Sequence, residues 1–476
     1  MMALATYLLL AAITVAYVLL VRSIWSRSRD VSIIIGSTIV YAWTFLGAWF
    51  FIPDAAIGFK GYRIGLNYYY LMEKMFPFML DRGYVVQLVA YACFVLALFG
   101  VLRVPLPSSK GADLAPVQLS REWLVAAGIA ALAVSVWSIR PLMGQAMLEH
   151  RPLYLLVHEW TGMRHSLHAF SASAACFAFV LGTTVRLAEG GKGAPFTERG
   201  SWLPGWSYLA GVLLMCVFLS LTGDRHTIFG SLMLGGMYLI NVKGRAARRS
   251  ALWMLAVGGG AMVAGGSLRE MAWTTSGLVV EAPRHEEFHL PEIQHIPRHP
   301  SSLIGKVGER MLSNEMFCAH FSLYGIMLRH VKPVPGISFS YLLHGFLPAD
   351  RRPPTAYAHY ARAAGLVPDQ GYTIHHASAW YLNAGWAGIP IGGAALGLIW
   401  LLLMRTASAF GAWGWPRLLP WLFVAFLPAV IRSGPESYKA LLIEGLLLPL
   451  LTLAPSMLFG GQVHHPGPTG RSPLHA

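Results

Sequence analysis

Three ionisable side chains stand in a row between two apolar runs of the chain. Asp224, Arg225 and His226 separate LAGVLLMCVFLSL from IFGSLMLGGMYLI. Ionisable groups in such surroundings are costly and usually face an interior cavity. Arginine is the residue suited to bidentate binding of phosphate oxygens. The corner is therefore a candidate anion-binding site, and an ordinary polar turn between two helices is the alternative interpretation.

A second corner of this kind lies near the end of the chain, in IRSGPESYK. It brings together Arg432, Glu436, Tyr438 and Lys439 between two further apolar runs. Basic side chains at helix ends can simply reach for water. Two arginine corners beside a basic loop nevertheless favour a site for an anionic group.

The segment between these corners adds a second arginine pair and a histidine pair. Arg351 and Arg352 precede two prolines, which favour an extended backbone. His375 and His376 stand just before an apolar run that begins near residue 384. A histidine at such a boundary is a candidate general base. Solvent exposure of the arginines and interfacial hydrogen bonding of the histidines are the alternatives.

Composition shows what must position these residues. The chain has 476 residues, of which 55% are hydrophobic and only 12% are charged. Soluble domains carry about 25% charged residues. Apolar runs of about 18–20 residues recur along the sequence and predict membrane-spanning helices. We therefore expect an all-α protein that crosses the membrane many times. We expect no nucleic-acid partner, although the net charge is +14.

The hydrophobic pattern predicts eleven spans and one long polar insertion. The expected spans are 4–21, 32–52, 84–102, 122–139, 166–185, 205–222, 226–241, 251–267, 384–404, 417–432 and 440–459. Lys and Arg alternate between short loops, which places the N-terminus outside and the C-terminus inside. Residues 1–268 would then hold eight spans, 269–383 a large outer loop, 384–459 three spans, and 460–476 a disordered inner tail.

The outer loop has the composition of a functional segment. It holds ten of the eighteen histidines and ten of the 36 Lys and Arg residues. Loops of this length are usually functional or disordered, and its many aromatic residues argue against disorder. Residues 311–330 are apolar enough for a candidate interfacial helix, and too polar to span.

The order of these parts resembles the bacterial oligosaccharide repeat-unit polymerases of the O-antigen type, which are related to O-antigen ligases. Three loose motifs carry the resemblance. They are a TG-polar-R corner (Thr222, Gly223, Asp224, Arg225), a GxS…P…P stretch (Gly336, Ser338, Pro348, Pro354) and NxGxxG (Asn383, Gly385, Gly388). The likeness covers residues 205–405 by motif and the first half of the chain by architecture.

The resemblance implies a fold like that of the multi-spanning (GT-C-like) lipid-linked-sugar glycosyltransferases. It implies undecaprenyl-pyrophosphate-linked oligosaccharide as substrate, presented at the outer face of the bacterial inner membrane. Arg225 and Arg432 would bind the pyrophosphate leaving group, and Arg351 and Arg352 would position phosphate or glycan. Asp224, His226, Glu436, Tyr438 and Lys439 would complete the binding site. His376 or His375 would be the base.

With arginines in this role, no metal or other cofactor is required. The resemblance also leaves room for a chain-length regulator as a partner. It does not separate polymerase from ligase activity. Ligases tend to carry a histidine about ten residues before GxxG, as His375 and His376 are here. Polymerase-like members often carry an acidic group nearby, and none lies between Gly371 and Gly388.

Two other classes of function remain as alternatives. HEEFH at 285–289 has the spacing of a zinc protease, in which two histidines bind the metal and a glutamate is the base. Pro283 and Pro291 leave at most two turns of helix around it. A transporter of lipid-linked sugars would also use outer arginines, but its spans should carry polar residues along a path.

Overall fold

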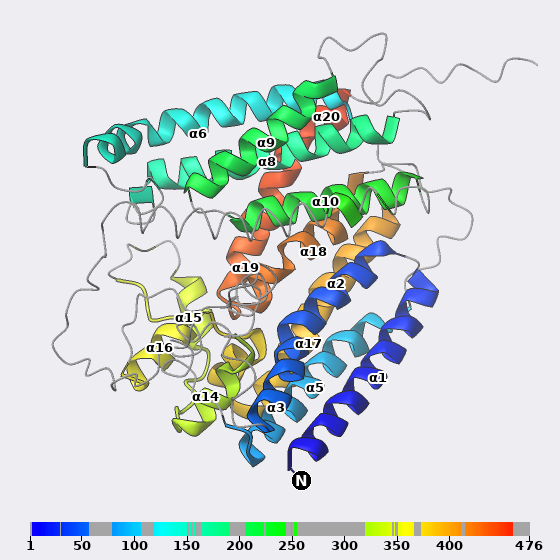
Figure 1. Cartoon of the computed structure of the whole chain (residues 1–476), viewed down its shortest axis with the longest axis vertical. Coiled ribbons are helices and arrows are strands. Elements are labelled where there is room, and N and C mark those ends of the chain that lie inside the picture. The colour runs from blue at the N-terminus through cyan, green and yellow to red at the C-terminus, as the bar shows by residue number, and fades with distance from the viewer. Residues whose placement is uncertain are drawn as a thin grey trace, which may run out of the picture. The chain divides into compact units, whose positions relative to one another are not determined.

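A computed structural model gives the fold of most of the membrane-embedded chain (Figure 1). It describes residues 2–28, 30–56, 79–105, 119–149, 153, 156–157, 163–189, 205–222, 225–243, 249, 252–254, 319–344, 347, 351–365, 373–410 and 415–459. Within these ranges helices are the only regular secondary structure.

The helices keep the order of the expected apolar segments. They are α1 (Met2–Ser28), α2 (Val31–Tyr41), η1 (Ala42–Leu46), α3 (Gly47–Ala56), α5 (Arg82–Leu102), α6 (Arg121–Glu149), α8 (Met163–Glu189), α9 (Gly205–Thr222), α10 (Arg225–Lys243), α14 (Ser322–Leu328), α15 (Ile337–Leu343), α16 (Ala356–Ala363), α17 (His376–Ala409), η5 (Trp415–Arg417), α18 (Leu418–Ile431), α19 (Ser437–Ala440), η6 (Leu441–Leu447) and α20 (Leu448–Phe459).

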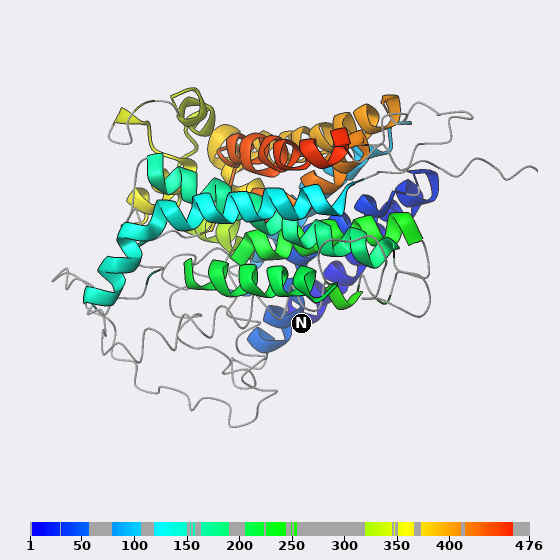
Figure 2. The same ribbon diagram turned by 90° about the horizontal axis from the view of Figure 1, so that it is seen from above.

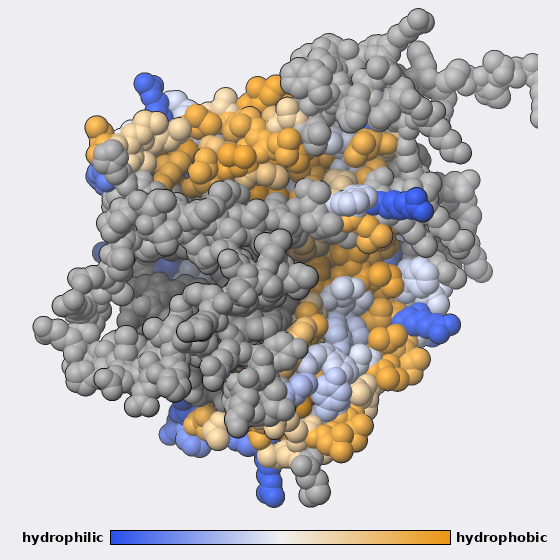
Figure 3. Space-filling view, viewed as in Figure 1, coloured by the Kyte–Doolittle hydropathy of each residue, from blue (hydrophilic) through white to orange (hydrophobic). Residues whose placement is uncertain are grey.

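Seven helical segments in the described part of the chain are long and apolar enough to cross a membrane, so the chain is a multi-pass membrane protein. They correspond to seven of the expected spans, and three shorter apolar helices correspond to 205–222, 226–241 and 417–432. The expected span 251–267 lies outside the described residues, apart from 252–254. Hydrophobic side chains cover much of the described surface on the face shown in Figure 3, as a lipid environment requires.

The residues divide into two compact units. Unit 1 comprises Met1–Ala112, Met262–Gly411 and Pro416–Leu446, and unit 2 comprises Asp113–Ala261, Ala412–Trp415 and Leu447–Ala476. In unit 1, α17 packs along α5, and α18 packs against both α2 and α17. The short helices α14, α15 and α16 each contact α17.

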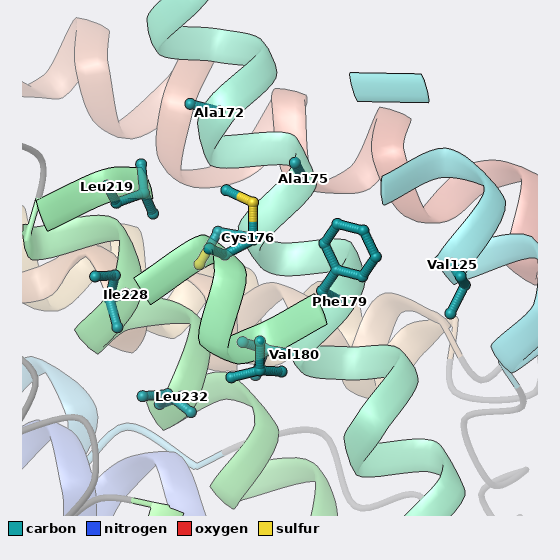
Figure 4. Close-up of a cluster of buried hydrophobic side chains, with 11 residues drawn as sticks. Val125, Ala172, Ala175, Cys176, Phe179, Val180, Leu219, Ile228 and Leu232 are labelled. Carbon is teal, nitrogen blue, oxygen red and sulfur yellow. The ribbon is translucent and has the colours of Figure 1, made fainter. Parts of the chain in front are cut away.

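Unit 2 is built around α8, which contacts α6, α9, α10 and α20. In Figures 1 and 2 the cyan-to-green helices α6, α8, α9 and α10 run side by side. Figure 4 shows their shared core, where Cys176, Phe179 and Val180 of α8 lie between Val125 of α6 and Ile228 of α10. Cys176 is buried in this core, where cysteine packs as a small apolar residue.

The long helix α17 starts eight residues before the span expected at 384, and it breaks at that position. Ala384 and Gly385 leave helical geometry, and Gly385 has φ +63°. A residue with a Cβ rarely adopts this conformation, so glycine is required there. The break separates a first part that carries the histidine pair from a second part in the apolar segment. On that second part Gly393 lies directly against the backbone of α5. A Cβ at this position would overlap the carbonyl oxygen of Phe94.

The described part of the segment 311–330 is packed inside unit 1. Residues 319–326 are buried, and α14 contacts α5 and α17. The tyrosine at position 324 fixes this placement: its hydroxyl donates to Asp81 Oδ2 at 2.8 Å, and its backbone N–H donates to Gln87 Oε1 at 2.7 Å. Residues 311–318 lie outside the described ranges.

Candidate functional site

Three segments that are far apart in the sequence meet at the carboxylate of Glu436. Ser338 Oγ donates to Glu436 Oε1 at 2.7 Å, and the backbone N–H of Ala356 donates to the same oxygen at 2.7 Å. Asn383 Nδ2 donates to Ser338 Oγ at 2.7 Å, and Asn383 Oδ1 accepts from the backbone N–H of Ser338 at 2.9 Å. We call these four residues the Glu436 junction.

The local structure of each segment explains how the junction forms. Ser338 lies in the first turn of α15, after Gly336 in the left-handed conformation. Asn383 ends the first part of α17, just before its break. Ala356 begins α16, so its N–H has no partner within that helix and is free to bond a carboxylate. Glu436 lies in the turn between α18 and α19.

The carboxylate of Glu436 has two different oxygens. Oε1 carries the two bonds described above, whereas Oε2 makes no hydrogen bond within the described part of the chain. The side chain is partly exposed. Gly434 lies beside Oε2, since a Cβ at that glycine would come within 2.6 Å of the oxygen.

His376 is fully buried beside this junction, and both of its ring nitrogens are bonded. Nδ1 lies 3.1 Å from the carbonyl oxygen of Val430, which can only accept, so Nδ1 carries the proton. Nε2 then accepts from the Tyr438 hydroxyl at 2.9 Å and from Trp380 Nε1 at 3.1 Å. The fold thus holds a neutral imidazole and joins α17 to α18 and α19.

His375 is also fully buried, and it begins α17 as its N-cap residue. Its Nδ1 accepts from the backbone N–H of Ala377 at 3.2 Å. Its Nε2 lies 3.3 Å from Thr44 Oγ1, and its backbone N–H donates to Ser322 Oγ at 3.0 Å. The ring therefore has a capping role that links α17 to η1 and α14.

A third buried histidine continues this set of contacts. His320 Nδ1 donates to the carbonyl oxygen of Thr44 at 2.8 Å, and Nε2 accepts from the Tyr84 hydroxyl at 2.8 Å. Burial lowers the pKa of His320 to about 4. We call Thr44, Tyr84, His320, Ser322 and His375 the histidine network.

The predicted arginines of unit 1 lie on segments that the junction joins. Arg432 is the C-cap of α18, is partly exposed, and accepts through its carbonyl oxygen from the backbone N–H of Ile374 at 3.1 Å. Arg351 is exposed, and Arg352 Nε donates to the carbonyl oxygen of Leu347 at 2.6 Å. Lys439 is exposed on α19.

The first corner belongs to unit 2. Arg225 and His226 are the first residues of α10, so they lie at a helix N-terminus. The sequence predicts a turn here, between the spans 205–222 and 226–241. Asp224 and Gly223 lie outside the described residues. The HEEFH segment at 285–289 also lies outside them. Among the described residues, no three His, Cys, Asp or Glu side chains lie together as metal ligands would.

Several contact residues were missed in the sequence. Ser338 and Asn383 enter the sequence prediction only as parts of motifs, and Thr44, Tyr84 and His320 are not among its predicted residues. The usable signal for His320 was its position as a polar residue within a largely apolar stretch. The contact between Thr44 and His375 joins residues 331 positions apart, which no spacing rule could indicate.

Comparisons with known proteins add no functional assignment to this geometry. A scan against protein-family models finds no match for this sequence, and neither do searches of curated proteins and of solved structures.

Proposed function

We propose that this membrane protein is a glycosyltransferase that joins undecaprenyl-pyrophosphate-linked oligosaccharide repeat units, as in O-antigen or exopolysaccharide assembly. One observation carries the proposal. Ser338 and Asn383, from two separate stretches that resemble the polymerase family, bond each other and also bond the second arginine corner through Glu436. Independent polar turns would have no reason to meet in this way.

The proposed arrangement in the membrane follows from the helices. The seven long helices, the three shorter ones and the segment 251–267 would make eleven spans, with a GT-C-like architecture. In the bacterial inner membrane the N-terminus and the loop 269–383 would then face the periplasm, and the C-terminus the cytoplasm. This orientation would place Ser338, Ala356 and Glu436 at the outer boundary, where a lipid-linked sugar would be presented.

The chemistry proposed for this boundary needs cations near a pyrophosphate. Arg432 lies four residues before Glu436, and Arg351 and Arg352 lie shortly before Ala356, so the junction fixes both basic segments. Arginine side chains can bind the pyrophosphate and stabilise the negative charge that grows on it as the glycosidic bond breaks. Arg225, at the start of α10, is a further candidate for binding an anionic group.

The test is a reconstitution with purified full-length protein in detergent. Undecaprenyl-pyrophosphate-linked oligosaccharide, extracted from the cells that encode the protein, is added together with EDTA, and the glycans are separated on a gel. A ladder of extended glycans that is lost in Arg432→Ala, at unchanged expression and melting temperature, supports the polymerase.

Two other outcomes would change the proposal. A single transferred unit that requires an added lipid acceptor would indicate a ligase. No glycan product at all, together with bound zinc that is lost in His285→Ala, would contradict the proposal and favour the HEEFH segment.

A further inference from the structure

The Glu436 carboxylate has the two features that a general base needs. A base must be held in one orientation by other groups, and it must keep a lone pair for the incoming proton. Two donors hold Oε1, each at 2.7 Å. Oε2 makes no hydrogen bond among the described residues, and the side chain is partly exposed. The neighbouring Gly434 has no side chain to cover that oxygen.

The two histidines considered as bases lack the second feature. Both have 0% relative exposure. The unprotonated nitrogen of His376 accepts from Tyr438 and Trp380, and that of His375 accepts from the backbone of α17. A substrate hydroxyl could reach either ring only after these bonds were broken and the helices had separated.

We propose that Glu436, and not His375 or His376, is the general base of the glycosyl transfer; this inference rests on the proposed function. Oε2 takes the proton from the acceptor sugar hydroxyl as that oxygen forms a bond to the anomeric carbon of the donor sugar. The bond between that carbon and the pyrophosphate oxygen breaks, and its electron pair stays on the pyrophosphate. The proton then leaves Glu436 for solvent.

In this scheme Ser338 is a positioning residue, because it acts through Oε1 and does not touch the reacting atoms. Asn383 supports it by bonding both its hydroxyl and its backbone N–H. The segments that carry Ser338, Ala356 and Glu436 therefore hold Oε2 in one orientation. The basic side chains on these segments bind the pyrophosphate leaving group.

The decisive variant is Glu436→Gln. An amide oxygen can still accept from Ser338 and Ala356, so the geometry is retained, but the basic lone pair is lost. We expect kcat to fall about 100-fold or more with little change in KM, since general bases contribute about that much. The melting temperature should match that of the wild type. Glu149→Gln, at an exposed position of α6, removes one negative charge elsewhere and should leave kcat within about twofold.

The proposal is overturned if Glu436→Gln is folded and keeps more than about a tenth of wild-type kcat. A second measurement holds even if that variant does not fold. His375→Gln and His376→Gln should each keep more than about a tenth of wild-type kcat, because both rings are fully buried and bonded within the fold. A loss of about 100-fold or more in kcat in either variant, at unchanged melting temperature, would assign the base to that imidazole. A wild-type protein with no glycan product would contradict the proposed function itself.

Discussion

The Glu436 junction and the histidine network use similar polar groups in unit 1 for different ends. In the network, every ring nitrogen of His320 and His375 is bonded and both side chains are fully buried. In the junction, one carboxylate oxygen is bonded by two donors and the other has no hydrogen-bond partner in the described part of the chain.

This difference in bonding indicates a structural role for the histidine network and a chemical role for the Glu436 junction. A buried polar group with all its bonds made holds elements together, and removing one partner leaves others unsatisfied. A partly exposed group with one oriented and one open atom can meet a substrate. Substitutions in the network should therefore lower stability, whereas substitutions in the junction should mainly lower activity.

The largest effect on stability is expected for His320→Ala. The change removes the hydrogen bonds from His320 to the Tyr84 hydroxyl and to the Thr44 carbonyl oxygen, and it opens a void among buried side chains. The free energy of unfolding should fall by about 4 kcal/mol. Thermal unfolding in detergent measures it. His344→Ala is the control, because among the described residues that exposed ring bonds only its own helix. Equal melting temperatures for the two variants would refute the role given to the network.

The network should also make stability depend on pH. Burial holds the pKa of His320 at about 4, below the ordinary value of about 6.5, so between these values the unfolded chain binds a proton that the fold does not. Stability should fall as the pH falls through this window, by up to about 3 kcal/mol at its acid end. Melting temperatures from pH 7.5 to 4.5 test this. His320→Gln should flatten the curve, and a curve that keeps its wild-type slope would remove His320 as the cause.

Ser338→Ala tests the junction, where we expect a larger effect on activity than on stability, the reverse of the network variants. Loss of one of the two bonds to Oε1 should cost about 1 kcal/mol of stability, while misorientation of the carboxylate should reduce kcat about tenfold. Ser340→Ala, two residues further along α15, removes a hydroxyl outside the junction and should have neither effect. Wild-type kcat in Ser338→Ala would mean that Oε1 needs no orientation by this hydroxyl.

The smallest effect is a gain in stability at the C-terminal end of α14. His330 follows α14 with φ +52°, and the backbone bonds His330 N–H to Met327 O and Val331 N–H to Ile326 O end the helix in a Schellman motif. Glycine adopts this conformation without strain, so His330→Gly should raise stability by up to about 1 kcal/mol. A lower melting temperature for this variant would show that the imidazole makes a contribution larger than the strain.

Much of the fold could be predicted from the sequence, because apolar runs must cross a membrane as helices. The start of α17 could not, since residues 376–383 mix polar and apolar side chains and are helical only because His375 caps them and unit 1 surrounds them. The apolar composition of residues 319–330 was equally consistent with the membrane surface and with the packed position of α14.

The candidate site was predictable by residue type but not by role. Arginine corners and a histidine pair are visible as polar groups in an apolar chain. Access is not visible, and access distinguishes His376, enclosed by Trp380 and Tyr438, from the partly exposed Glu436. No acidic residue lies between Gly371 and Gly388, and the fold brings Glu436 to Ser338, which also bonds Asn383.

The most direct test is a cryo-EM structure of the full-length Glu436→Gln variant with undecaprenyl-pyrophosphate-linked oligosaccharide bound. We expect saccharide density with a sugar hydroxyl within hydrogen-bond reach of the side chain at position 436, and pyrophosphate density near Arg432. Saccharide against His375 or His376, with their present bonds broken, would contradict the assignment of the base. Saccharide bound away from Ser338, Asn383 and position 436 would contradict the whole account.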